Sequence, residues 1–227
     1  MHELLSRLTR FKEELSPAQQ ALYQNLARHG QQPKTLIISC ADSRVVPEQI
    51  IQAGPGELFV CRNTGNIVPP FSQANGGVTS TVEYAVMALG VTDIIVCGHS
   101  DCGAMKAVAN PVGLEKIPNV AAWLHHSQVA AQVVEKCHPN IGPKERVRAI
   151  CLENVVAQLA HLRTHPSVAA GIARGDISLH GWFFDIGPGQ ILALDGASGR
   201  FEPVTEGRSL PIAHKAEPRL AADFCAT

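Results

Sequence analysis

Two short segments of the chain combine thiols with side chains that can bind or position a metal ion. Cys40, Asp42 and Arg44 follow one apolar run. His99 and Cys102 follow another, and their three-residue spacing lets one turn present an imidazole and a thiolate to the same ion. If the two apolar runs are neighbours in the fold, Cys40 reaches that ion as well. The result is a site with two thiolates and one imidazole.

This ligand set suits zinc, and three protein ligands leave the fourth tetrahedral position open for water or substrate. An open position is typical of catalytic zinc, whereas four cysteines at CxxC spacings, the pattern of a closed structural site, are absent from the sequence. Asp42 or Cys61 is the alternative fourth ligand that would close the tetrahedron. We predict one catalytic Zn²⁺ per subunit at Cys40, His99 and Cys102. A structural zinc or unconnected core thiols are the alternatives.

Asp42 and Arg44 have the chemistry of a pair that supports such a site. A carboxylate two residues from a ligand can accept a hydrogen bond from zinc-bound hydroxide. Arg44 can hold the carboxylate in a two-pronged, charge-assisted contact and keep it off the metal. Taken alone, the two residues are more typical of a local turn pair without a catalytic role.

The elements that must position these residues alternate along the chain. The sequence predicts strands at residues 35–39, 57–61 and 93–97, and helices at 47–52, 77–89, 103–109, 118–137, 143–164 and 166–174. This alternation favours an α/β fold with a parallel sheet, whose sites lie at the carboxyl ends of the strands. Residues 178–186 and 190–194, joined by a Gly-Pro-Gly loop, predict a terminal hairpin. We therefore expect a central, mostly parallel sheet of four strands plus an antiparallel C-terminal strand, flanked by helices.

Residues 2–15 and 17–29 precede any strand and carry apolar side chains at helical spacing. An apolar helix outside the repeating pattern must bury its face, and packing on a partner subunit would do so. We expect one domain over residues 1–227, made of an N-terminal helical arm at 1–33 and an α/β core at 34–227.

The composition excludes several classes of protein. The chain has 227 residues, 45% of them hydrophobic and 17% charged, which excludes a disordered chain. Its net charge of −1 provides no electrostatic attraction to nucleic acid or to an anionic membrane. The apolar runs fall far short of the roughly 20 residues of a membrane span, and the N-terminus lacks a secretory signal. Seven irregularly spaced cysteines do not form a disulfide framework, so we expect a cytoplasmic protein.

Residues 40–44 (CADSR) and 99–103 (HSDCG) resemble the CxDSR and HxxCG signature of the β-class carbonic anhydrases. The similarity extends over nearly the whole chain, to the branch shared by plants, cyanobacteria and some bacteria. Further matching segments are PGELF at 55–59, RN at 62–63, GN at 65–66, EYA at 83–85 and CG at 97–98.

The resemblance implies zinc-dependent, reversible hydration of CO₂ to bicarbonate and a proton, by attack of zinc-bound hydroxide on the carbon. Cys40, His99 and Cys102 are then the zinc ligands, and Asp42 and Arg44 form the catalytic dyad. Two thiolates donate more charge than imidazoles, so the bound water should be less acidic than in a three-histidine site, where its pKa is about 7. Activity should therefore rise with pH in the alkaline range.

The resemblance also places Gln31, Phe59 and Tyr84 along the substrate cleft, part of which comes from the neighbouring subunit of a dimer. The backbone of Gly103 flanks the site. Without the resemblance, Gln31 is a loop amide and the two aromatic residues belong to the core. The implied assembly is a homodimer or a higher homo-oligomer, such as a tetramer or an octamer.

The sequence departs from the pattern of the family at two positions, and two alternative functions stay open. Some bacterial members are inhibited by bicarbonate at a second site built around a tryptophan; the corresponding residue here is Ile37, so we expect the open form at neutral pH. Ala41 replaces a more common serine, with little expected consequence.

The alternative functions are a hydrolase of CS₂ or COS on the same fold and a zinc or thiol-redox protein without turnover. We expect no metal role for the remaining cysteines, which are Cys61, Cys97, Cys137, Cys151 and Cys225.

Overall fold

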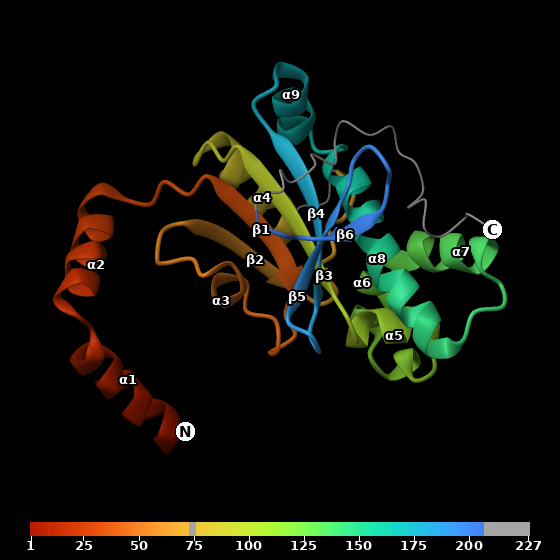
Figure 1. Cartoon of the computed structure of the whole chain (residues 1–227), viewed down its shortest axis with the longest axis horizontal. Helices are drawn as coiled ribbons and strands as arrows, with labels where there is room; N and C mark the ends of the chain where they lie inside the picture. Colours follow the sequence, from red (N-terminus) through yellow and green to blue (C-terminus); the bar gives the residue numbers. More distant parts are fainter. Residues whose placement is uncertain (73–75, 207–227) are drawn as a thin grey trace.

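Six strands form the central sheet, in the order β2-β1-β3-β4-β5-β6 (Figure 1). The computed structural model describes residues 1–72 and 76–206. The strands are β1 (Thr35–Cys40), β2 (Leu58–Asn63), β3 (Asp93–His99), β4 (Ser178–Asp185), β5 (Gln190–Leu194) and β6 (Phe201–Pro203). The helices are α1 (His2–Glu14), α2 (Pro17–His29), α3 (Pro47–Ile51), α4 (Gly77–Met87), α5 (Gly103–Ala109), α6 (Pro118–Leu124), α7 (Gln128–Cys137), α8 (Pro143–Leu162) and α9 (Pro166–Arg174), with 3₁₀ helices η1 (Leu114–Lys116) and η2 (His125–Ser127).

Strands β1 to β4 pair in parallel, and β5 pairs antiparallel with β4. This confirms the α/β fold with four parallel strands and an antiparallel C-terminal strand. The sheet has one strand more than the sequence predicts, because β6 is only three residues long and too short to show a period. The helix predicted over 118–137 is also interrupted at η2, where the Gln158 side chain donates to the carbonyl of His126 at 3.1 Å.

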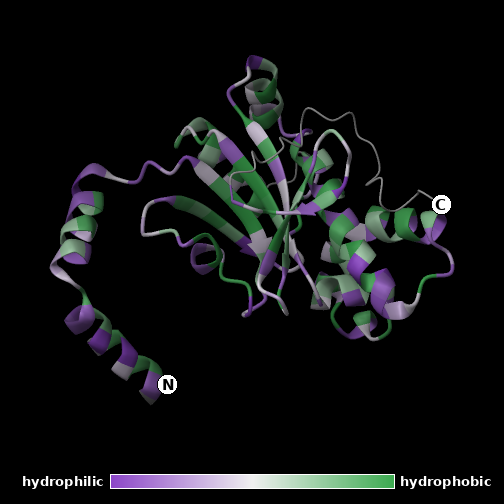
Figure 2. Cartoon of the chain, in the orientation of Figure 1, coloured by the Kyte–Doolittle hydropathy of each residue, from purple (hydrophilic) through white to green (hydrophobic). Residues whose placement is uncertain are grey.

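Alternate residues of the central strands face opposite sides of the sheet, as the pleat requires. Leu36, Ile38, Ile94 and Val96 pack with buried residues of α4, α8 and α9 in the larger apolar cluster. The opposite face has a smaller cluster formed around Ile37, Ile95 and Cys97. The strands are accordingly hydrophobic over most of their length (Figure 2).

The arm formed by α1 and α2 extends away from the sheet (Figure 1). A capping box between Ser16 and Gln19 begins α2. The arm contacts the core where the Leu26 side chain covers Gly56, at which an added Cβ would lie 2.7 Å from Leu26 Cδ2. Several other apolar side chains of the arm are exposed, among them Leu8 at 68% and Phe11 at 54%. The described residues contain no helix that is both long enough and apolar enough to cross a membrane.

Candidate functional site

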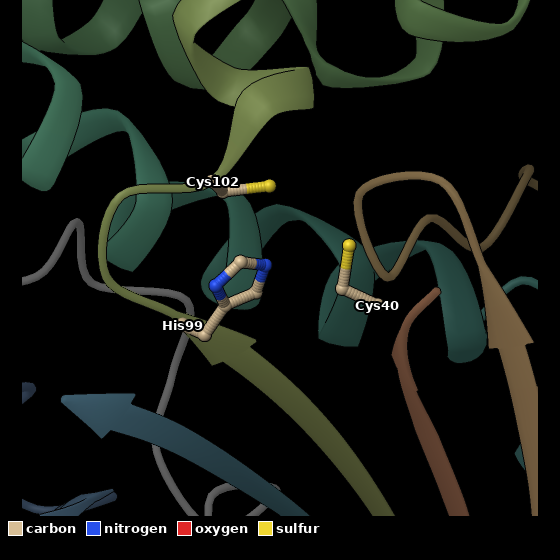
Figure 3. Close-up of side chains that lie close together, drawn as sticks. All are labelled: Cys40, His99 and Cys102. Carbon is tan, nitrogen blue, oxygen red and sulfur yellow. The ribbon is translucent and has the colours of Figure 1, made fainter. Parts of the chain in front are cut away.

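The parallel pairing of β1 with β3 brings two of the candidate ligands to one edge of the sheet. Cys40 is the last residue of β1 and His99 the last residue of β3. Cys102 follows a short turn and is the N-cap of α5. The three side chains point toward one another (Figure 3). Their ligand atoms all lie within 4.8 Å of one another, and each residue is at most 5% exposed. We call these three residues the Cys₂His cluster.

The hydrogen bonding of His99 leaves one ring nitrogen available to a metal. His99 Nδ1 lies 2.9 Å from the carbonyl oxygen of Ser100 and donates to it. A carbonyl oxygen can only accept, so Nδ1 carries a proton and Nε2 is the ring nitrogen left to bind a metal. This Nε2 is buried without any hydrogen-bond partner. A buried, unpartnered imidazole nitrogen facing two thiols matches the donor set and the spacing that zinc requires.

The two thiols of the cluster influence each other strongly. The Cys102 thiol donates to the sulfur of Cys40, which lowers the pKa of Cys40 and raises that of Cys102. Burial raises the pKa of Cys102 further. A cation between the two sulfurs would lower the pKa of both thiols, because it stabilises both thiolates.

Asp42 is held next to the cluster by Arg44. Arg44 Nε donates to Asp42 Oδ1 at 3.0 Å, and Nη2 donates to Oδ2 at 2.7 Å. These hydrogen bonds keep the pKa of Asp42 well below its usual range, so the carboxyl group is ionised. Asp42 Oδ2 also lies 4.0 Å from Nε2 of His99. The structure thus places an ionised acceptor beside the open side of the cluster.

Two further residues hold the dyad in place. Asp101 accepts from Arg44 Nη1 at 3.0 Å and forms an ion pair with Lys106. Arg62 Nε donates to the carbonyl of Cys40 at 3.1 Å, and its Nη2 donates to the carbonyl of Asp42 at 2.8 Å. The sequence alone indicates a role for neither residue. A charged residue at the end of the otherwise apolar β2 was the available signal for Arg62.

The rival thiols do not join the cluster. Cys61 is half-buried on β2, where burial raises its pKa and Thr81 is its hydrogen-bond partner. Burial raises the pKa of Cys97 and of Cys151 to about 12, which makes them unreactive thiols. Cys225 lies outside the described residues. Within residues 1–72 and 76–206, the Cys₂His cluster is the one group of three ligand residues close enough to share a metal ion.

The residues expected along the substrate cleft lie elsewhere on the same chain. Phe59 pairs with Leu36, four positions before Cys40, or about 13 Å along the strand. Its ring lies tilted against that of Tyr84, with 5.9 Å between ring centroids, and Tyr84 is 51% exposed. Gln31 is exposed in the connection from α2 to β1. The structure brings the two aromatic rings together but does not bring them to the cluster of their own chain.

Gly103 lies next to the Cys₂His cluster, whereas Ile37 is buried in the smaller apolar cluster of the sheet. Gly103 is the first residue of α5, directly after Cys102, and an added Cβ there would meet nothing within 4 Å. The space beside the first residue of α5 is therefore open. Ile37 is 1% exposed and packs against Ile95 on the smaller apolar face.

Comparison with known proteins relates this geometry to a family. A family model described as carbonic anhydrase matches residues 35–191. A carbonic anhydrase of Pseudomonas aeruginosa is 50% identical over 206 residues, which cover 91% of this chain and 93% of that protein. Carbonic anhydrase 1 of Escherichia coli O157:H7 is 47% identical over 204 residues, covering 90% and 92% of the two chains.

Solved structures agree with these matches. The β-carbonic anhydrase CcaA superposes with a TM-score of 0.88 at 39% identity, covering 95% of this chain and 96% of that one. A structure described among two tetrameric β-carbonic anhydrases from Sordaria macrospora has a TM-score of 0.74 at 33% identity, covering 85% and 95%. The chain belongs to the β-class carbonic anhydrases, the enzymes that hydrate carbon dioxide reversibly to bicarbonate and a proton.

Proposed function

We propose that Cys40, His99 and Cys102 hold one Zn²⁺ per subunit for CO₂ hydration, and that Asp42 and Arg44 are the dyad that orients the attacking water. The observation that carries this proposal is the buried, unpartnered Nε2 of His99 facing two thiols. When bound, the zinc ion supplies the Lewis acidity that activates water for attack on CO₂.

The side chains around the cluster divide the remaining tasks. Ionised Asp42 accepts a hydrogen bond from the attacking water, which aims a lone pair of that water at the carbon. Arg44 occupies both carboxylate oxygens and so keeps Asp42 from turning onto the ligand cluster. Apolar side chains, including Ile67 and Met105, pack against the cluster and suit a neutral, linear substrate.

The proposal includes a homo-oligomer, a dimer at least and by resemblance a tetramer or an octamer. Its support is the arm, whose apolar side chains are exposed on a single chain. A partner subunit would supply Gln31, Phe59 and Tyr84 to the substrate cleft, with Gly103 of the first subunit flanking it. We further propose that residues 1–33 and 34–227 act as one unit, in the cytoplasm, where the thiols of the cluster stay reduced.

A stopped-flow assay of CO₂ hydration, combined with zinc analysis, tests the proposal. We expect the wild type to contain one zinc per chain and to be active, and Cys40→Ser to lose both zinc and activity. Cys61→Ser is the matched control and should keep both. A zinc-loaded wild type without CO₂ hydration would overturn the assignment, and CS₂ or COS hydrolysis by that inactive protein would point to the hydrolase alternative.

A further inference from the structure

One peptide unit beside the Cys₂His cluster is hydrogen-bonded at both of its polar groups. The amide of Gly65 donates to Cys40 Sγ at 3.4 Å. The carbonyl of Thr64, which belongs to the same peptide unit, accepts from Trp123 Nε1 at 2.8 Å. A chain of two hydrogen bonds therefore runs from an indole on α6 through one peptide to the sulfur on β1.

The next peptide unit is fixed from a different helix. Asn154 Nδ2, on α8, donates to the carbonyl of Gly65 at 3.0 Å. Gln158 Nε2 donates to Asn154 Oδ1 at 2.9 Å, while Gln158 Oε1 accepts from the amide of Val68 at 2.8 Å. Both side chains are completely buried. Buried amides with several of their hydrogen bonds made hold a backbone segment rigidly.

The position of Gly65 depends on its lack of a side chain. Its φ of +85° lies in the left-handed region that favours glycine. An added Cβ would lie 3.0 Å from Ala104 Cβ and 3.1 Å from Met105 Cε. The loop therefore approaches α5 closely, and this approach directs the Gly65 amide toward Cys40.

We propose that Trp123 and Asn154 are positioning residues of the zinc site, which act through the Gly65 amide on the sulfur of Cys40. An amide that donates to a thiolate withdraws charge from the sulfur, and a second hydrogen bond to the carbonyl of that peptide polarises the amide further. Cys40 then donates less charge to a bound zinc, which stays a stronger Lewis acid. The inference rests on the proposed function, because it requires Cys40 as a ligand.

The test uses full-length protein loaded with Co²⁺ in place of zinc, in which the thiolate-to-cobalt charge-transfer band reports the electron density on sulfur. Trp123→Phe keeps an aromatic ring but removes the indole donor. We expect its band to move to lower energy, because the sulfur regains electron density, and its zinc affinity to fall about tenfold, because the Gly65 peptide beside Cys40 loses its anchor. Trp182→Phe, which alters the chain's other tryptophan, on β4, is the matched control, and its band and zinc affinity should equal those of the wild type.

A second variant tests whether the shift of the band is specific to the hydrogen bonds at Gly65 or results from altered folding. Asn154→Ala removes the hydrogen bond on the other side of Gly65 and should move the band in the same direction. Far-UV circular dichroism of the zinc-free proteins identifies any variant that fails to fold, in which case the other variant decides.

The outcomes separate the two proposals. If the cobalt-loaded wild type lacks a thiolate band, or Cys40→Ser leaves that band unchanged, the assignment of Cys40 as a ligand fails. If the wild type shows the band and a folded Trp123→Phe or Asn154→Ala leaves the band and the zinc affinity unchanged, the ligand assignment holds. The positioning role is then wrong.

Discussion

The carboxylate of Asp42 and the guanidinium of Arg44 meet in a two-pronged contact, with 3.0 Å from Nε to Oδ1 and 2.7 Å from Nη2 to Oδ2. The same two-residue spacing recurs in Arg174 and Asp176, where a single contact of 2.6 Å joins two side chains that are more than half exposed. The chain thus contains a catalytic candidate and a surface pair of the same composition. Substitutions in the exposed Arg174–Asp176 pair therefore serve as controls for substitutions in the Asp42–Arg44 pair.

Asp42→Asn should lower kcat for CO₂ hydration about a hundredfold while the zinc content stays unchanged. The amide group is a weaker acceptor than a carboxylate, and it can present a donor where the attacking water needs an acceptor. Stopped-flow kinetics with metal analysis measure both quantities. Asp176→Asn should leave kcat unchanged. Wild-type kcat in Asp42→Asn would contradict the assigned role.

Gly65→Ala should lower the free energy of unfolding by about 3 kcal/mol, and Gly189→Ala by about 1 kcal/mol. Both glycines have positive φ, of +85° and +66°, so both substitutions carry a backbone cost. Only the first places a Cβ against neighbouring atoms, since an added Cβ at Gly189 meets nothing within 4 Å. Urea unfolding measures both values. Equal losses would show that close packing at Gly65 does not contribute.

Glu153→Gln should stabilise the protein increasingly as the pH rises. Glu153 is 4% exposed, its Oε2 has no hydrogen-bond partner, and burial raises its pKa to about 7 from an ordinary value of 4.5. The folded state therefore keeps the proton where the unfolded chain has lost it, so stability is greatest below pH 4.5 and falls as pH rises through about 7. This gap corresponds to about 3 kcal/mol.

Urea unfolding at several pH values checks this prediction. The glutamine variant cannot ionise, so its advantage over the wild type should be absent near pH 4.5 and complete near pH 8. Glu135→Gln, at an exposed position of α7, should match the wild type at every pH. A pH-independent difference between Glu153→Gln and the wild type would rule out ionisation as the cause.

Leu8→Glu combined with Phe11→Glu should reduce the mass of the assembly measured by light scattering. Both side chains lie on the arm, more than half exposed, and an interface that buries them would then have to bury two charges. Val112→Glu is the matched control, because Val112 is 85% exposed on the core. An unchanged mass in the double variant would show that the arm is not the interface.

Removal of zinc by a chelator should lower the Tm of the wild type, and restored zinc should raise it again. Binding to the folded state alone stabilises that state in proportion to the logarithm of the free zinc concentration. His99→Ala lacks the buried Nε2, so its Tm should respond much less to zinc. Calorimetry with and without the chelator measures both responses. Equal responses in the two proteins would place the metal elsewhere.

The parts of the site that could be predicted from sequence lie at the ends of apolar strands. Cys40 and His99 each end a buried run, and parallel strands place such ends at one edge, so the cluster followed from the pattern. The contacts of Trp123 with Thr64 and of Asn154 with Gly65 join segments far apart in the chain. No local pattern marks such contacts, because packing of α6 and α8 creates them.

The interruption of the helix predicted over 118–137 and the contact of Asp101 with Arg44 have equally specific causes. The break at η2 depends on a tertiary hydrogen bond from Gln158 to the carbonyl of His126, which periodicity does not register. Asp101 holds Arg44 from a positive φ of 59°, a conformation set by the turn between His99 and Cys102. The place of Phe59 and Tyr84 in a cleft shared with a second chain stays a prediction, and both lie away from the cluster of their own chain.

The neighbouring positions of β1 and β3 also determine when the metal site forms. Cys40 and His99 are far apart in the sequence. The chain has already lost the conformational entropy of bringing them together when the two strands pair. The proposed ion would therefore enter a preorganised site and would not have to assemble it, unlike the metal of a zinc finger. We therefore expect the proposed zinc to exchange in the folded protein, so that its supply controls activity but not whether the chain folds.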